Sequence, residues 1–431
     1  MATIGSILSK LVGPQKNMFP RPSTSENTKL IERLCTEMSF AKDIVYGAIK
    51  HGGNNNVLIF TCIPLAAKSQ GQRICCILRT RKMYNFSEKQ QYPIDQSVKM
   101  LVALTHRFGK LGVGLPIPAI LAYDSTFENP IYSPYTIQET VEGTTLLRQY
   151  HEMNLSLLHP RGPTHNPRLL ERRQLARQIA EFIARKESCA LPGYGTIRNA
   201  SDGRTDDPAV LAARFVLAVA KTRIAGRLIP ITCHISRFIG ELVHARLRKA
   251  SSRDNGDGDG VDERRKARNL VSMWRNMSEK RRLTDQPAIL WHPDFHPRNI
   301  MFESDAVRKK LTGVIDWDLC MALPRIMTRG PPTFLWNEES TTTLSKLESE
   351  AIQDAFDETI EKLVPGFLED AYSTRGVLVR ALGMYALFGV DYVHYHELSY
   401  EQLVQLYEVE FPGELGGYVT KGSIAVGKPP T

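Results

Sequence analysis

Two short polar segments constrain the fold of this chain more than any other feature. The first, Trp291–Ile300, carries Asp294 and Asn299, and the second, Gly313–Asp318, carries Asp316. A carboxylate, an amide shortly after it and a second carboxylate beyond a hairpin form the set that phosphoryl transfer from a nucleotide requires. The first carboxylate orients the attacking hydroxyl, and the amide and the second carboxylate hold Mg²⁺ on the phosphates.

The residues between the two segments predict how the segments meet. Ile300–Phe302 and Leu311–Ile315 are apolar runs that can pair as antiparallel strands. A hairpin of these strands returns Asp316 to the side of Asn299, so that both can reach one ion. We therefore assign Asp294 as the catalytic residue, and Asn299 and Asp316 as the metal ligands.

The chain before these segments predicts a small lobe of strands and helices. Residues 1–29 read as a disordered tail, and residues 30–143 form the lobe. Its expected elements are a helix over about 30–50, strands at 57–62 and 74–78, a helix over 97–108, and strands at 119–123 and 135–139.

Residues 144–415 predict a larger, mainly helical lobe. Its clearest helix covers 170–186, and residues 209–249 contain further helical periods within a helical insertion at about 200–285. Residues 416–431 read as a second tail. A strand-rich lobe followed by a helical lobe places the chain in the α+β class.

Charge and composition limit the classes of partner. The chain has 431 residues and a formal net charge of +9, but no basic stripe is interleaved with stacking aromatic residues. No apolar run is long enough to span a membrane. We therefore expect neither a nucleic acid nor a membrane as a partner.

Cysteine usage and the N-terminus bear on the compartment. The chain has seven cysteines and no Cys-x-x-Cys pair, which favours a reducing compartment such as the cytoplasm. No secretory signal is apparent. The first acidic residue is Glu26, and the basic residues before it are accompanied by several serines, a pattern that leaves a mitochondrial transit peptide open as the alternative.

Five segments together resemble one known family. His292–Asn299 is similar to the His-x-Asp-x-His-Pro-x-Asn loop of the aminoglycoside phosphotransferase and choline kinase-like family, and Ile315–Asp318 to its Ile-Asp-Trp-Asp/Glu metal-binding strand. Residues 117–124 resemble its Ile-Pro-x-x-Val-x-Ala-Tyr-Asp segment and 137–143 its hinge. Residues 331–336 resemble a segment of its fungal members.

The resemblance covers about residues 40–400 and implies a two-lobed, protein-kinase-like fold. It implies that ATP or GTP binds with Mg²⁺, and that a small molecule accepts the phosphate on a hydroxyl. The residues that the resemblance assigns to the nucleotide are Gly53 and Asn54 in the phosphate-covering turn, Arg79 on the following strand, and Gln138 and Thr140 in the hinge.

The nucleotide side departs from the family pattern. Arg79 stands where the family has a lysine, and its fork-shaped guanidinium keeps the charge with a different geometry. The helix carboxylate that should orient this cation is replaced by Ser97, with Asp95 nearby. Within the family, the acceptor binds between the catalytic loop and the C-terminal helices, where Asp318, Asp391 and Tyr395 are candidates for holding a cationic amine.

Other functions stay open at this point. A nucleotide- or protein-binding module without activity is the alternative that Arg79 and the missing helix carboxylate favour. A second alternative is a hydrolase with His292, Asp294 and His296 as metal ligands. In a kinase, His292 would instead brace the loop by hydrogen bonds. A protein kinase lacks support, because the Gly-x-Gly-x-x-Gly, Asp-Phe-Gly and Ala-Pro-Glu motifs are absent.

Overall fold

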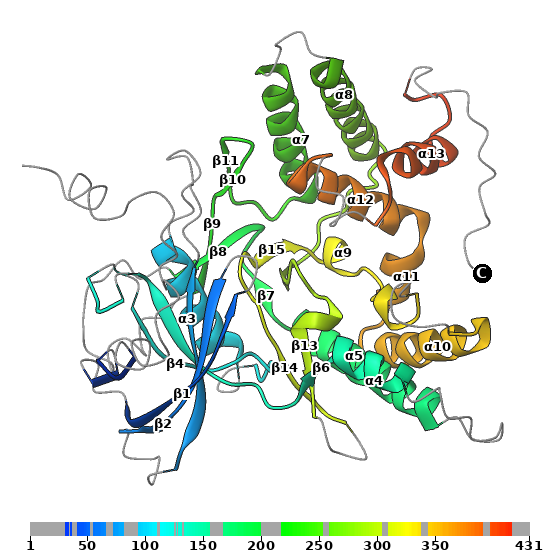
Figure 1. Ribbon diagram of the computed structural model, residues 1–431. Coiled ribbons are helices and arrows are strands. Elements are labelled where there is room, and N and C mark those ends of the chain that lie inside the picture. Colours follow the sequence, from blue (N-terminus) through cyan, green and yellow to red (C-terminus); the bar gives the residue numbers. More distant parts are fainter. Residues whose placement is uncertain are drawn as a thin grey trace, which may run out of the picture. The chain divides into compact units, whose positions relative to one another are not determined.

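The structure is a computed structural model (Figure 1), and it describes residues 31–33, 35–36, 41–51, 55–65, 72–81, 94–109, 113–124, 126, 128–131, 133–155, 167–199, 217–252, 258–303, 309–337, 344–390 and 397–415. Both predicted tails lie outside these residues. The chain divides into two compact units. Unit 1 is Met1–Glu152, Arg198–Leu217 and Asp294–Asp318, and unit 2 is Met153–Ile197, Ala218–Pro293 and Leu319–Thr431. The predicted lobe boundaries divide the chain differently and stay a prediction.

Unit 1 is built on an antiparallel sheet of five strands, coloured blue to cyan in Figure 1. Its strands are β1 (Ala41–His51), β2 (Asn55–Pro64), β3 (Ile74–Arg81), β4 (Ile120–Asp124) and β5 (Tyr135–Glu139). They lie in the order β1-β2-β3-β5-β4, and each neighbouring pair is antiparallel. The strands predicted in this unit are therefore confirmed.

Side-chain alternation explains why one face of this sheet is buried. Successive residues of a strand point to opposite faces, and β2 accordingly alternates between partly exposed and buried side chains. Leu58, Phe60 and Cys62 face a core that also contains Leu78 and Ile137. Fully burying each large apolar side chain contributes about 1.5–3 kcal/mol, which fixes the register of the strands.

The helix predicted over about 30–50 is only partly correct. Ile31–Arg33 and Cys35–Thr36 are helical, but Ala41–His51 forms strand β1 and pairs with β2. The register shifts between Lys42 and Val45, and again between Tyr46 and Ile49. These irregularities break the alternation of period two that would have marked the strand in the sequence. The second helix is confirmed as α3 (Ile94–Phe108).

Unit 2 contains a second sheet and a small hairpin. The sheet has the order β7-β12-β15-β8-β9. Its strands are β7 (Ala190–Leu191), β8 (Gly195–Asn199), β9 (Leu217–Ala220), β12 (Ala288–Trp291) and β15 (Met321–Pro324). The hairpin consists of β10 (Thr222–Ile224) and β11 (Arg227–Ile229).

Most of unit 2 is helical, as predicted. The longer helices are α5 (Pro167–Glu187), α7 (Ile235–Ser252), α8 (Gly258–Glu279), α10 (Lys346–Leu363), α12 (Thr374–Phe388) and α13 (Tyr400–Glu410). The shorter helices are α4 (Leu146–Leu155), which begins in unit 1, α9 (Arg325–Thr328) and α11 (Phe367–Tyr372). α7 and α8 pack side by side, as do α5 and α10 (Figure 1).

The helical periods predicted over 209–249 are confirmed from Ile235 onward and wrong for Leu217–Ile229, while 209–216 lie outside the described residues. The described residues from Leu217 to Ile229 form β9, β10 and β11, and α7 begins only at Ile235. Strands β10 and β11 are three residues long, so they are too short to show a period. Ala225 and Gly226 connect them with φ values of 48° and 80°, the left-handed conformation of a tight hairpin turn.

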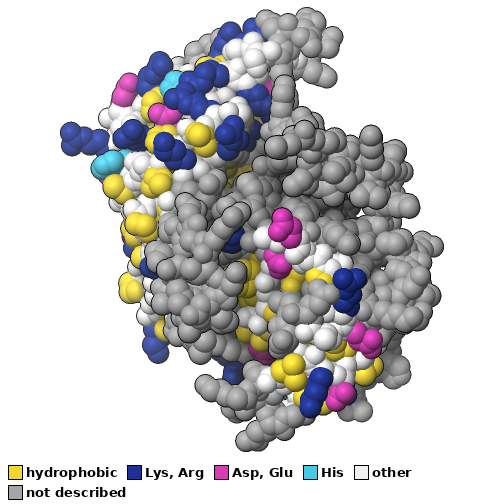
Figure 2. Space-filling view, turned by 90° about the vertical axis from the view of Figure 1, so that its left-hand side faces the viewer, with side chains coloured by type: hydrophobic (Ala, Val, Ile, Leu, Met, Phe, Trp, Pro, Cys, Tyr) yellow, Lys and Arg dark blue, Asp and Glu magenta, His cyan; other side chains and the backbone are white. Residues whose placement is uncertain are grey.

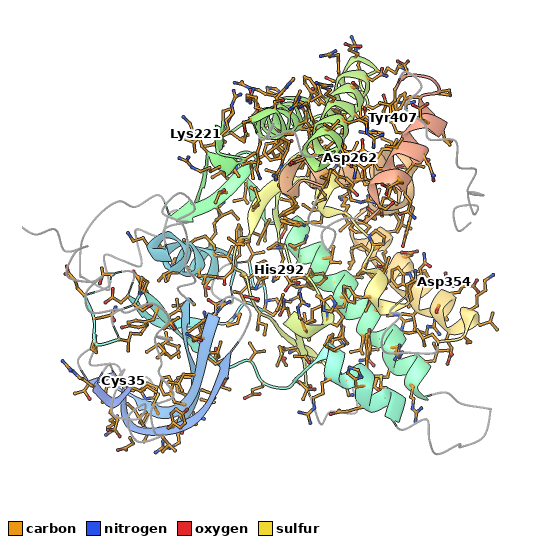
Figure 3. The ribbon with its side chains drawn as sticks, turned by 45° about the horizontal axis from the view of Figure 1, so that its top comes forward. Cys35, Lys221, Asp262, His292, Asp354 and Tyr407 are labelled. Carbon is orange, nitrogen blue, oxygen red and sulfur yellow. The ribbon has the colours of Figure 1, made fainter. Side chains whose placement is uncertain are left out.

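Basic side chains gather on part of the surface: Figure 2 shows Lys and Arg side chains close together on the upper part of the face it draws. Lys221, directly before β10, is labelled in Figure 3. Exposed basic residues of β10, β11 and α7 include Arg223, Arg227, Arg237 and Arg248. None of the helices in the described residues is long and apolar enough to cross a membrane.

The α+β fold class is confirmed by these elements: antiparallel sheets in both units, with most helices in unit 2.

Candidate active site

The predicted hairpin forms in unit 1 and carries the polar residues of both segments. β13 (Ile300–Phe302) pairs with β14 (Leu311–Val314), with Ile300 opposite Val314. Directly beyond this pair, the Ile315 amide donates a hydrogen bond to the Asn299 carbonyl, with an N–O distance of 2.9 Å. The backbone therefore brings Asp316 beside Asn299, which confirms the pairing predicted from the sequence.

The hairpin packs closely against the segment that follows β5. β6 (Thr144–Thr145) adds a third strand beside β13. Gly143 has a φ of 103°, and a Cβ at this position would lie 1.9 Å from the Phe302 carbonyl oxygen. Only glycine allows this approach. The Thr312 hydroxyl donates to the Glu142 carbonyl at 2.6 Å and fixes the other strand.

Asn299 holds Asp294 by two hydrogen bonds. Its Nδ2 donates to the Asp294 carboxylate Oδ2 at 2.7 Å and to the Asp294 carbonyl at 2.9 Å. Asn299 ends a short 3₁₀ turn that begins at Pro297, and the His296 ring nitrogen accepts a hydrogen bond from the Arg298 amide at the start of this turn. Because the amide nitrogen is used by Asp294, the amide oxygen is the end of Asn299 that suits a metal ion.

Arg298 is a partner of Asp294 that the sequence did not predict. Its Nη2 lies 2.6 Å from Asp294 Oδ1, and its Nε lies 3.3 Å from Oδ2. Arg298 is four residues after Asp294, a spacing that brings side chains together in a turn, and this could have been noticed. The pair is partly exposed, with 57% of the Arg298 side chain accessible.

The second acidic segment is fixed by the tryptophan at its centre. Trp317 is 2% exposed, and its indole Nε1 donates to the Val314 carbonyl at 2.8 Å. Asp316 has a φ of 66°, a left-handed conformation that costs free energy in a residue other than glycine. The buried ring and the unusual backbone place the Asp316 and Asp318 carboxylates near one cation, Arg79.

Arg79 of β3 bridges these two carboxylates. Its Nη2 donates to Asp316 Oδ1 and, at 2.8 Å, to Asp318 Oδ2. Burial by itself lowers the pKa of the guanidinium, but the charges of Asp318 and then Asp316 outweigh burial and raise the pKa above its ordinary value. Arg79 therefore stays a cation beside Asp316 and Asp318, at the position where the resemblance predicts a phosphate-binding lysine.

The donor set fits magnesium held jointly with a nucleotide. Among the described residues, no group of three or more His, Cys, Asp or Glu side chains could hold a metal ion. His292 belongs to unit 2, whereas Asp294 and His296 belong to unit 1, so the alternative metal site of these three residues stays a prediction. Mg²⁺ commonly takes one or two protein carboxylates and completes its shell with phosphate oxygens and waters. Asn299 and Asp316 can supply the protein oxygens, and the ion would neutralise charge on the transferred phosphoryl group.

Of the other residues assigned to the nucleotide, two are described and two lie outside the described residues. Gln138 is buried and donates to the Thr136 hydroxyl at 2.9 Å, while the Thr140 hydroxyl donates to the Cys75 carbonyl at 3.0 Å. Both side chains thus have partners in the sheet, and their nucleotide contacts stay a prediction. Gly53 and Asn54 lie outside the described residues.

Four further residues named in the sequence analysis are not described. Asp391 and Tyr395 lie outside the described residues, as do the side chains of Asp95 and Ser97.

His292, labelled in Figure 3, directly follows β12 in unit 2 and is 3% exposed. Its burial is consistent with the predicted brace.

A comparison with models of protein families shows to which family the chain belongs. The sequence model described as the phosphotransferase enzyme family matches residues 90–327, which include the motifs at 292–299 and 315–318. The chain belongs to the phosphotransferase enzyme family. Membership confirms the family predicted from the motifs at 292–299 and 315–318.

Individual relatives of this phosphotransferase-family chain are distant. A curated relative from Candida glabrata, altered inheritance of mitochondria protein 9, mitochondrial, is 22% identical over 289 residues. That match covers 55% of this chain and 44% of the relative, so the chain spans less than half the length of the curated relative it matches.

The solved structures that resemble this chain also share little sequence identity with it. An aminoglycoside phosphotransferase, crystallised as a thermostable mutant with AMP-PNP and hygromycin B, is 14% identical with a TM-score of 0.47, covering 92% of this chain and 100% of that one. An ethanolamine kinase from Plasmodium vivax is 12% identical with a TM-score of 0.39, covering 86% and 82%. At these TM-scores the likeness assigns no role to a residue of this chain.

Proposed function

We propose that this chain transfers the γ-phosphate of ATP or GTP, with Mg²⁺, to a hydroxyl group of a small molecule. The observation that carries the proposal is the contact of Asn299 with Asp294, together with the backbone hydrogen bond that sets Asp316 beside Asn299. Family membership supports the reaction class.

Each residue has a distinct part in this proposal. Asp294 accepts a hydrogen bond from the attacking hydroxyl and aims its oxygen at the γ-phosphorus. Asn299 keeps the Asp294 carboxylate in place through Nδ2 and offers its oxygen to the metal. Asp316 supplies the carboxylate ligand. Arg79 gives the phosphates a cation that stays charged at every physiological pH.

The test is phosphate transfer to a panel of amino alcohols, aminoglycosides, choline and sugars. Wild type and Asp294→Asn are compared with ATP or GTP and Mg²⁺, and ester formation is followed by mass spectrometry. Loss of a general base costs roughly 10²–10⁴-fold in rate, so Asp294→Asn should fall by about this factor. Asp354→Asn is the matched control, because Asp354 is an exposed carboxylate of α10 (Figure 3).

A measurement of nucleotide binding distinguishes a variant that has lost only catalysis from a protein that does not use nucleotides. The Asp294→Asn variant should bind Mg-nucleotide as wild type does, since Asp294 acts on the acceptor. Unchanged transfer by Asp294→Asn would remove Asp294 from the mechanism. A wild type that binds no nucleotide would contradict the proposal as a whole.

A binding module without transfer is the second candidate, favoured by the arginine at position 79 and its ion pairs with Asp316 and Asp318. Ligand at 100 times its Kd stabilises a folded protein by about 2.7 kcal/mol, which a thermal shift detects readily. Stabilisation by Mg-nucleotide without transfer to any acceptor would favour the module. Stabilisation accompanied by transfer would favour the kinase.

Location in the cell is a separate proposal. Composition predicts the cytoplasm, whereas the name of the Candida glabrata relative includes the word mitochondrial and favours the alternative. Imaging the full chain with a C-terminal fluorescent tag distinguishes the two, because such a tag leaves the N-terminus unaltered.

A further inference from the structure

Asp318 has two partners in the sheet of unit 1, and both are polar. Its Oδ2 accepts a hydrogen bond from Arg79 Nη2 at 2.8 Å and another from Asn55 Nδ2 at 2.9 Å. Asn55 and Arg79 are 263 and 239 residues away from it in the sequence. A carboxylate oxygen shared by two donors from adjacent strands holds those donors in fixed positions.

The register of the sheet explains why both donors reach one oxygen. Val57 of β2 lies opposite Arg79 of β3, so their side chains project from the same face. Asn55 is two residues before Val57 on β2 and therefore also projects from that face. Strands β2 and β3 thus present an amide and a guanidinium together, and Asp318 binds both.

The two acidic residues around Trp317 differ in their surroundings. The Asp316 side chain is 41% exposed, whereas the Asp318 side chain is 21% exposed and is held by Asn55 as well as by Arg79. Asp316 is thus the more accessible carboxylate, and Asp318 is the more firmly fixed partner of the arginine.

We propose that Asp318, fixed by Asn55, is the positioning residue that orients Arg79 toward the nucleotide phosphates. In this arrangement Asp318 replaces the helix carboxylate for which this sequence has Ser97, and Asp316 is left to the metal ion. The proposal rests on the proposed function and adds a division of work between the two carboxylates. In this proposal Asp318 acts through Arg79 and does not hold a cationic amine of the substrate, the role that the family resemblance suggested for it.

A double-mutant cycle on nucleotide affinity tests this division. The variants are Arg79→Ala, Asp318→Asn and their combination, and calorimetry measures the Kd of ATP and of GTP with Mg²⁺ and again with EDTA. Hydrogen bonds to charged groups are worth about 1.5–3 kcal/mol, so each single variant should raise the Kd roughly tenfold or more. The combination should add little to Arg79→Ala, because Asp318 acts only through that side chain.

Asp316→Asn is the matched control, since it removes the same charge two residues earlier. It should raise the Kd far more in Mg²⁺ than in EDTA, because in EDTA it weakens only the contact with Arg79, whereas in Mg²⁺ it also removes a metal ligand. Asp318→Asn should raise the Kd under both conditions. Asn55→Ala should act in the same direction as Asp318→Asn with a smaller factor, and it carries the test if Asp318→Asn fails to fold.

The failures of the two proposals are distinguishable. Additive effects of Arg79→Ala and Asp318→Asn would overturn the positioning role, as would an Asp318→Asn effect that disappears in EDTA, which would make Asp318 a metal ligand. In either case the wild type still binds nucleotide, and the proposed function stands. A folded wild type without nucleotide affinity would overturn the proposed function, and the positioning role with it.

Discussion

Arg329 in unit 2 and Arg79 in unit 1 each bridge two carboxylates, but they do so in very different surroundings. Arg329 lies 2.9 Å from Glu187 Oε2 and 3.0 Å from Asp370 Oδ2. The three side chains are 3%, 8% and 10% exposed. Buried charges are stable only when paired, so this closed group ties α5 to α11 and serves the fold.

In the Arg79 group, the two carboxylates are accessible to solvent. The arginine is 12% exposed, but its partners Asp316 and Asp318 are 41% and 21% exposed. Solvent-accessible carboxylates can exchange one cation for another at little cost, whereas buried ones cannot. The same residue types thus make a structural tie in one unit and a site suited to ligands in the other. The exposure of the acids distinguishes the two.

Removing Arg329 should have the largest effect on stability. Arg329→Ala leaves Glu187 and Asp370 buried without their cation, and breaking such a group costs about 3–5 kcal/mol. The measurement is unfolding in urea, followed by circular dichroism. Adding Glu187→Gln and Asp370→Asn to Arg329→Ala should recover part of the loss, since the two carboxylate charges that Arg329 paired are then removed as well. A loss below about 1 kcal/mol would contradict the closed character of this group, because so small a cost is typical of exposed pairs.

Removing Arg79 should lower stability far less while weakening nucleotide binding. Asp316 and Asp318 can turn to water when the cation is lost, so we expect Arg79→Ala to cost about 1 kcal/mol in the same urea experiment. A loss as large as that of Arg329→Ala would mean that the Arg79 group is also a structural tie, and the comparison would fail.

The smallest effect should come from an ion pair with no role in either group. Arg148 and Glu152 lie four residues apart on α4, 2.8 Å from each other, and are 69% and 51% exposed. Such pairs contribute about 0.3–0.5 kcal/mol. Arg148→Ala should therefore change the free energy of unfolding by no more than this and leave the Kd of nucleotide unchanged. A larger change would show that the urea experiment overstates the cost of removing any arginine.

Local patterns in the sequence predicted the elements whose partners are near or whose periodicity is regular. The β13–β14 hairpin is an example, because Ile300–Phe302 and Leu311–Val314 are separated by a short connection. The long helix α5 is another, since its apolar residues repeat at helical spacing. Strand β1 could not be predicted in this way, because two register shifts remove its period and pairing with β2 decides its conformation.

The candidate site shows the same limit. Asp294, Asn299 and Asp316 stand in one stretch of chain, so their spacing alone indicated a shared role. The partners of Arg79 are 237 and 239 residues away, and no periodicity connects positions so distant. The sequence showed that a helix carboxylate was missing. Only the fold of unit 1 shows that Asp318 accepts hydrogen bonds from both Arg79 and Asn55.

Transfer of labelled phosphate tests the central claim most directly. Wild type and Asp294→Asn are incubated with γ-labelled ATP or GTP, Mg²⁺ and a small-molecule extract of cells, which supplies many hydroxyl acceptors at once. The account predicts that wild type forms a labelled phosphate ester in a reaction that requires Mg²⁺, and that Asp294→Asn loses it by about 10²–10⁴-fold. Label transfer that survives unchanged in Asp294→Asn, or a nucleotide-bound wild type that labels nothing, would contradict it.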